Sequence, residues 1–89
     1  MNGDKFLDFC KDIVVNYFNE HSDKSDQHKL TKDDVYIVWS VKVLQNNKAL
    51  VSTKVPDGMY YEITYNGDKK EAYVDAYKKW CNYTVKEEE

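Results

Sequence analysis

The chain has 89 residues, of which 42% are hydrophobic, 33% charged and 15% aromatic. This is the length of one small domain and the composition of a globular chain, so a disordered chain and a doubly wound cofactor-binding fold are both excluded. The formal net charge is −3, and all 13 basic residues are lysines. Arginine makes bidentate contacts to bases and phosphates, so an acidic chain without it is a poor candidate for direct DNA readout.

Residues near the N-terminus do not form a signal peptide, because Asp4 and Asp8 interrupt the apolar run that such a peptide needs. The longest apolar run, residues 35–39, is much shorter than the roughly 20 residues of a membrane helix. Cys10 and Cys81 lie far apart and form no CxxC motif. We therefore expect a cytosolic protein with reduced thiols and no membrane association.

Apolar residues at three- and four-residue steps predict an amphipathic helix over about residues 4–20. The opposite side of this helix carries Asp4, Asp8 and Asp12 at four-residue spacing. Residues 22–34 are polar and predict a loop that includes one helical turn capped by Thr31.

The second half of the chain predicts a sheet over about residues 35–77. Residues 35–43 alternate between two sides, with Ile37 and Trp39 expected on the buried one. Residues 45–47 predict a turn, followed by strands over 48–55 and from Met59 to the Asn-Gly pair at 66–67.

Residues 68–82 fit two structures. As a helix, the segment is capped by Asp68 and carries an apolar stripe that ends at Trp80. As a strand, it follows a hairpin loop over residues 66–69 that pairs Ile63 with Ala72. The sequence leaves both structures open, and residues 86–89 predict an acidic tail.

The predicted fold is a single α+β domain over residues 1–89, with an N-terminal amphipathic helix packed on an antiparallel meander of three or four strands. With Trp39 in the core, Trp39→Ala is expected to cost roughly 3–5 kcal/mol. The expected core consists of Phe6, Phe9, Ile13, Tyr17, Ile37, Trp39, Val41, Val51, Tyr61 and Ile63.

No motif in the chain points to catalysis. His21 and His28 lie around Asp23 and Asp26 in the polar loop, but their spacing matches no metal-ligand signature, and we interpret them as a solvated loop. Cys10 lies on the apolar helix stripe, where a free cysteine is usually a small hydrophobic core residue. We expect no catalytic residue, no metal and no cofactor.

Several segments resemble small uncharacterised proteins encoded by phages and prophages of Gram-positive bacteria. The resemblance covers nearly the whole chain and lies in residues 33–36, 38–40, 44–49, 57–62 and 64–69, and in Tyr73, Asp75, Tyr77, Lys78 and Lys79. It implies a small phage-encoded accessory protein that acts in the host bacterial cytosol, and it implies no established reaction.

Two groups of residues are candidates for partner binding. The chain has eight tyrosines, a residue favoured at protein interfaces. Tyr36, Tyr60, Tyr73 and Tyr77 are expected on the outer face of the sheet, where they would form a partner surface with Trp80. The second group is the acidic row Asp4, Asp8 and Asp12, which would present carboxylates where a partner normally binds phosphates.

The expected function is that of a non-enzymatic phage accessory protein that binds and inhibits a host or defence protein, with an anti-CRISPR-like inhibitor as one form. The alternative is a small single-strand nucleic-acid-binding protein that stacks bases on the same tyrosines. The negative net charge of the chain disfavours nucleic-acid binding. Such binding would require lysines to gather on the outer face of the sheet, namely Lys42, Lys54, Lys69 and Lys79. A homodimer formed through an exposed edge strand is a third expectation.

Overall fold

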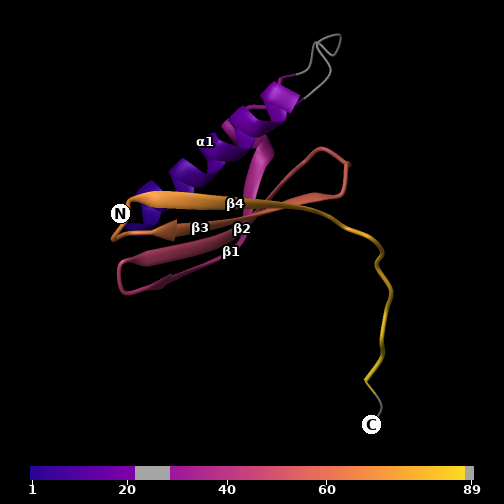
Figure 1. Cartoon of the computed structure of the whole chain (residues 1–89). Helices are drawn as coiled ribbons and strands as arrows, with labels where there is room; N and C mark the ends of the chain where they lie inside the picture. The colour runs from indigo at the N-terminus through magenta and orange to yellow at the C-terminus, as the bar shows by residue number, and fades with distance from the viewer. Residues whose placement is uncertain (22–28, 88–89) are drawn as a thin grey trace.

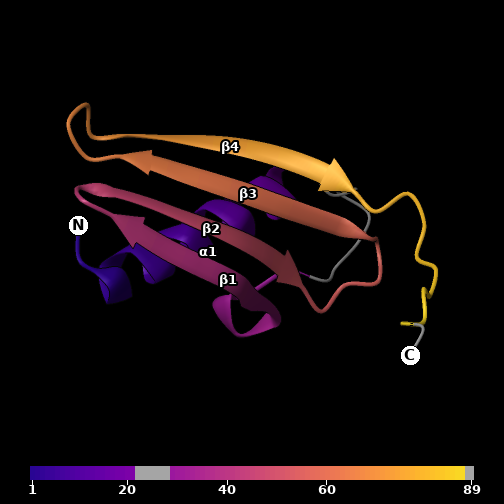
Figure 2. The same ribbon diagram turned by 90° about the horizontal axis from the view of Figure 1, so that it is seen from below.

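The computed structural model describes residues 1–21 and 29–87. One helix packs on one face of a four-stranded antiparallel sheet with the strand order β1-β2-β3-β4, and Figures 1 and 2 show that none of these described residues forms a layer over the other face of the sheet. This confirms the predicted α+β meander. The elements are α1 (Gly3–His21), the 3₁₀ turn η1 (Lys32–Asp34), β1 (Val35–Val43), β2 (Asn46–Thr53), β3 (Met59–Asn66) and β4 (Glu71–Lys78).

Helix α1 begins where Asn2 caps it, since the Asn2 side-chain oxygen accepts a hydrogen bond of 2.9 Å from the Lys5 N–H. Near its other end, the Asn19 side chain both donates to and accepts from the backbone of Leu30, at 3.1 and 2.9 Å. These two bonds tie the end of α1 to the segment that leads into β1. The helical turn predicted after Thr31 is present as η1, with the Thr31 N–H donating to the Asp34 carboxylate at 3.0 Å.

The core lies between α1 and the sheet. Phe6, Cys10 and Val14 lie at four-residue steps on α1, so they share one face of the helix and are fully buried. Tyr61 and Ile63 of β3 lie beneath them, and the Phe9 and Tyr65 rings meet edge to face at 6.3 Å. The buried core consists of Phe6, Cys10, Val14, Leu30, Val35, Ala49, Val51, Tyr61, Ile63 and Tyr65.

A β-bulge in β1 overturns part of the predicted core. Ile37 pairs with Val51 and Trp39 pairs with Leu50, so Val38 is an extra residue without a partner. Beyond the bulge the strand presents its opposite side to the helix. Trp39 is 43% exposed and Val41 is 48% exposed, on the uncovered face of the sheet. The prediction that these two residues belong to the core, and the large cost expected for Trp39→Ala, are therefore wrong.

The first hairpin turn also differs from the prediction. Val43 pairs directly with Asn46, so the turn consists of residues 44–45 instead of 45–47. Leu44 takes the left-handed conformation, with φ 55°. Asn47, expected in the turn, is a buried residue of β2.

Residues 71–78 form a strand, so the helical alternative for this segment is wrong. The Asn66 side-chain oxygen accepts hydrogen bonds from the backbone N–H groups of Asp68 and Lys69, at 3.1 and 3.2 Å. This turn lets Asn66 pair with Glu71, so Ile63 pairs with Val74 instead of Ala72. A two-residue shift leaves every side chain on its expected face.

The two hairpin turns pack against each other through Gly67. Its N–H donates to the Asn46 side chain at 3.1 Å, and the Gln45 side chain donates to the Asp68 carboxylate at 2.9 Å. A Cβ at Gly67 would collide with the carbonyl oxygen of Gln45. Residue 67 must therefore be glycine for the turns to approach this closely.

Truncation of a residue beneath α1 should destabilise the protein far more than truncation on the uncovered face. Ile63 is fully buried, so Ile63→Ala removes buried surface and leaves a cavity, at an expected cost of about 2–5 kcal/mol. Val43 is 61% exposed, and Val43→Ala should stay within about 0.5 kcal/mol of the wild type. Urea unfolding measures both values, and equal costs would contradict this assignment of the core.

Gly67→Ala should lower stability by about 1–3 kcal/mol, because the new Cβ forces the two turns apart. Gly3→Ala is the matched control, since a Cβ at Gly3 meets nothing within 4 Å. Thermal unfolding of both variants checks this, and a Gly67→Ala protein as stable as the control would refute the close packing of the turns.

Candidate interaction surface

The face of the sheet that α1 leaves uncovered, called here the open face, gathers large apolar and aromatic side chains. Alternation and antiparallel register place them there, since residues directly opposite in the ladder share a face. Trp39 is 43% exposed and Tyr77 is 52% exposed. The open face comprises Tyr36, Trp39, Val41 and Val43 of β1, Lys48 and Leu50 of β2, Tyr60, Glu62 and Thr64 of β3, and Tyr73, Asp75 and Tyr77 of β4.

This arrangement brings together four of the tyrosines that the sequence singles out: Tyr36, Tyr60, Tyr73 and Tyr77. Trp39 and its apolar neighbours in β1 were missed as surface residues, because the bulge that turns them outward leaves no mark in the sequence. Their exposure adds a row of apolar side chains along β1 to the tyrosines of this face, and exposed apolar surface of this kind usually marks interaction sites.

The charges of the open face are mainly negative. Lys48 Nζ lies 3.2 Å from a carboxylate oxygen of Glu62, whose cross-strand neighbour is Asp75. The Tyr73 hydroxyl donates to the Glu71 carboxylate at 2.8 Å, and this hydrogen bond raises the pKa of Tyr73. Lys42 faces the helix side, since its partner in the ladder, Asn47, is buried there.

Trp80 does not join the open face. The Lys79 N–H donates to the Gly58 carbonyl at 2.7 Å, and beyond this bond the chain leaves the sheet as an extended segment, residues 80–87, called here the C-terminal arm. Trp80 is 96% exposed, and Tyr83 and Val85 are 79% and 80% exposed. In Figure 1 the arm runs away from α1, toward the side of the sheet that bears the open face.

The acidic row lies on α1, on the other side of the sheet. Lys32 Nζ lies 2.9 Å from Asp8 Oδ1 and 2.9 Å from Asp12 Oδ1, so two of the three carboxylates share one lysine. Hydrogen bonds to these carboxylates raise the pKa of Lys32. Asp4 is exposed in the first turn of the helix.

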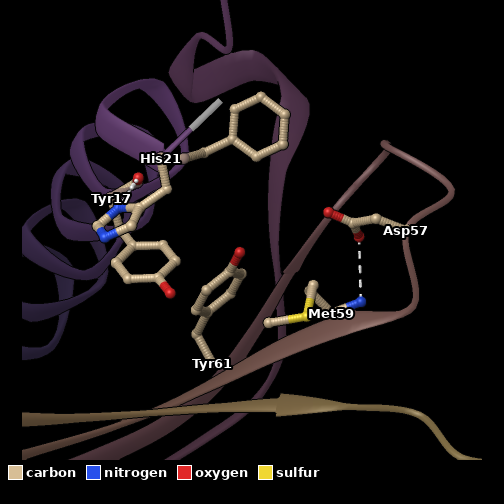
Figure 3. Close-up of a pocket in the computed structure, with 6 residues that line it drawn as sticks. Tyr17, His21, Asp57, Met59 and Tyr61 are labelled. Atoms are coloured by element: carbon tan, nitrogen blue, oxygen red, sulfur yellow. Dashed lines mark hydrogen bonds between the residues drawn. The ribbon is translucent and has the colours of Figure 1, made fainter. Parts of the chain in front are cut away.

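A small pocket of about 200 Å³ lies between the end of α1 and β3 (Figure 3). Its walls are largely aromatic: the Tyr17 and Tyr61 rings meet at 5.6 Å, and the His21 ring stacks on Tyr17 at 4.1 Å. The His21 Nδ1–H donates to the Tyr17 carbonyl at 2.8 Å, and burial raises the pKa of Tyr61, with Asp57 adding to the shift. The pocket is smaller than the roughly 300–1,000 Å³ of typical ligand sites.

The described residues contain no group of three or more His, Cys, Asp or Glu side chains that could hold a metal ion. Asp23, Asp26 and His28 lie outside these residues. Within the same part of the chain, no helix is both long and apolar enough to cross a membrane.

Fold and surface together define a helix-backed antiparallel sheet whose second face is open and aromatic. The chain belongs to DUF6275, a family of unknown function, whose model matches residues 7–87. A search of curated proteins found no match, and a search of solved structures found none either.

The two cysteines should differ sharply in reactivity. Burial raises the pKa of the Cys10 thiol to about 12, so only about one thiol in 10⁴ is ionised at pH 8, and Cys10 is inaccessible as well. Cys81 is exposed on the arm. Ellman's reagent at pH 8 should titrate one thiol per folded chain quickly and both after unfolding in urea. In the Cys81→Ser control the fast reaction should vanish, and two fast thiols in the folded wild type would contradict the burial of Cys10.

Proposed function

We propose that this protein is a non-enzymatic accessory protein, encoded by a phage or prophage, that acts in the host cytosol by binding another protein through its open face. The resemblance noted in the sequence favours the phage source and a host or defence protein as the class of partner to be inhibited. The observation that carries the proposal is the uncovered, aromatic and apolar face opposite α1.

Three properties of this face suit a protein partner. Its tyrosines offer large contact areas at a small cost in side-chain entropy, and Trp39 adds a residue type common at binding hot spots. Its strands form a rigid platform, since they hydrogen-bond along an unbroken order of four. Covering its apolar side chains removes them from water, which stabilises a complex by roughly 25 cal/mol per Å².

Charge favours a protein over a single-stranded nucleic acid. Bases could stack on the tyrosines, but phosphates would meet Glu62 and Asp75 in the middle of the face. Of the lysines needed for nucleic-acid binding, Lys69 lies in the turn before β4 and Lys79 follows its other end. Because these two lysines lie at opposite ends of β4, they do not form a continuous row of positive charge along the face.

The experiment that tests the proposal replaces three exposed tyrosines of the open face together, as Tyr36→Ser, Tyr73→Ser and Tyr77→Ser. Tagged protein is used to capture binding proteins from a nuclease-treated lysate of a Gram-positive host. An untagged copy of the chain is added to the same assay as a further candidate partner. The wild type should retain a specific protein, and the triple variant should retain at least tenfold less, because hot-spot residues of the contact are lost.

The matched control is the double variant Asp8→Asn with Asp12→Asn, which alters α1 and leaves the open face intact. It should bind as the wild type does. Equal retention by the triple variant, or retention of no protein by any form of the chain, would overturn the proposal. Loss of binding in the aspartate control alone would instead assign the contact to the acidic row.

A further inference from the structure

We propose that the occupant of the open face is a second copy of this chain: two copies meet open face to open face across a two-fold axis, and each C-terminal arm packs on the other copy. The inference rests on the proposed function in taking the open face as the binding surface, and it concerns what covers that face in the free protein, before a host or defence protein is bound. In such a pair the same patch serves both copies, as an isologous interface requires.

The arm is the first reason. Trp80, Tyr83 and Val85 are at least 79% exposed, an unfavourable state in water for three large side chains so close together in sequence. The arm leaves β4 toward the open-face side of the molecule (Figure 1). A second copy laid against that face would therefore lie on the side to which the arm extends.

The arm is poorly built to fold back on its own sheet. Its root is fixed where Lys79 bonds to Gly58, at the end of the strands, and from there the chain runs beyond the sheet (Figure 2). Reaching its own open face would require a sharp reversal. Residues 80–87 contain neither glycine nor proline, and Thr84 and Val85 favour extended backbone.

The size of the surface agrees with this arrangement. Four strands of about eight residues outline a face of roughly 500 Å², given strand spacings near 4.8 Å and about 3.3 Å per residue. A stable interface buries about 800 Å² on each partner. The face alone falls short of that area, and an arm of eight residues that can span about 27 Å supplies the remainder.

The first test is the mass in solution by sedimentation equilibrium, for which the wild type should give twice the chain mass of 10.5 kDa. The arm variant Trp80→Ser with Tyr83→Ser, and the face variant Val41→Lys, should each weaken dimerisation at least tenfold. The control is Val74→Ser, which changes an exposed residue on the helix side of β4 and should leave the dimer unchanged. Circular dichroism checks that all variants are folded.

The second test locates the arm. A nitroxide on Cys81 of unlabelled protein is mixed with ¹⁵N-labelled protein, so that broadening of amide signals reports contacts between copies only; buried Cys10 stays unlabelled. Broadening should centre on the open-face residues Trp39, Thr64 and Tyr73. No broadening, or broadening on α1 instead, would overturn the proposal.

A monomeric wild type would also overturn the inference. If that monomer still bound another protein through its open-face tyrosines, the proposed function would stand and only the second copy as occupant of the open face would be wrong. If binding to every protein, including the second copy, were insensitive to those tyrosines, both proposals would fail.

Discussion

The β-bulge at Val38 decides which side of the sheet receives the apolar second half of β1. Because Ile37 and Trp39 pair with consecutive residues of β2, everything after Val38 is turned over. Ser40 and Lys42 then face the helix side, and Trp39, Val41 and Val43 face water. The protein thereby leaves exposed the side chains that would otherwise enlarge its core, and the open face gains stability from being covered.

The rest of the molecule is arranged around this division into two faces. Phe6, Cys10 and Val14 pack tightly on the sheet and exclude water from its helix side. This packing holds the strands in place as a platform. Helix α1 lies entirely on that side, so nothing of the described chain competes for the open face (Figure 2). The arm, whose root is fixed by the bond from Lys79 to Gly58, adds apolar surface that is exposed in a single copy.

Periodicity predicted α1, the strands and the clustering of the tyrosines, because each depends on local spacing and on the twofold alternation of a strand. The side taken by Trp39 could not be predicted, because the side of residues 35–43 that includes Trp39 is wholly apolar and the other carries Ser40 and Lys42, so alternation favours burial of Trp39. One extra residue in the strand reverses the two sides. The local sequence pattern could not decide between a helix and a strand for residues 71–78 either. It depends on the Asn66 turn and on pairing with β3. Trp80 does not lie on the predicted partner surface, because strand β4 ends at Lys78.

The most direct measurement is the fluorescence of Trp39 in a Trp80→Phe variant, which retains an aromatic residue in the arm and leaves Trp39 as the only tryptophan. In dilute solution, emission should be that of a solvent-exposed indole and acrylamide should quench it strongly. As the concentration rises, emission should move to shorter wavelength and quenching should fall, because the second copy covers Trp39. Short-wavelength, weakly quenched emission at every concentration would contradict the account, since it would place Trp39 beneath α1.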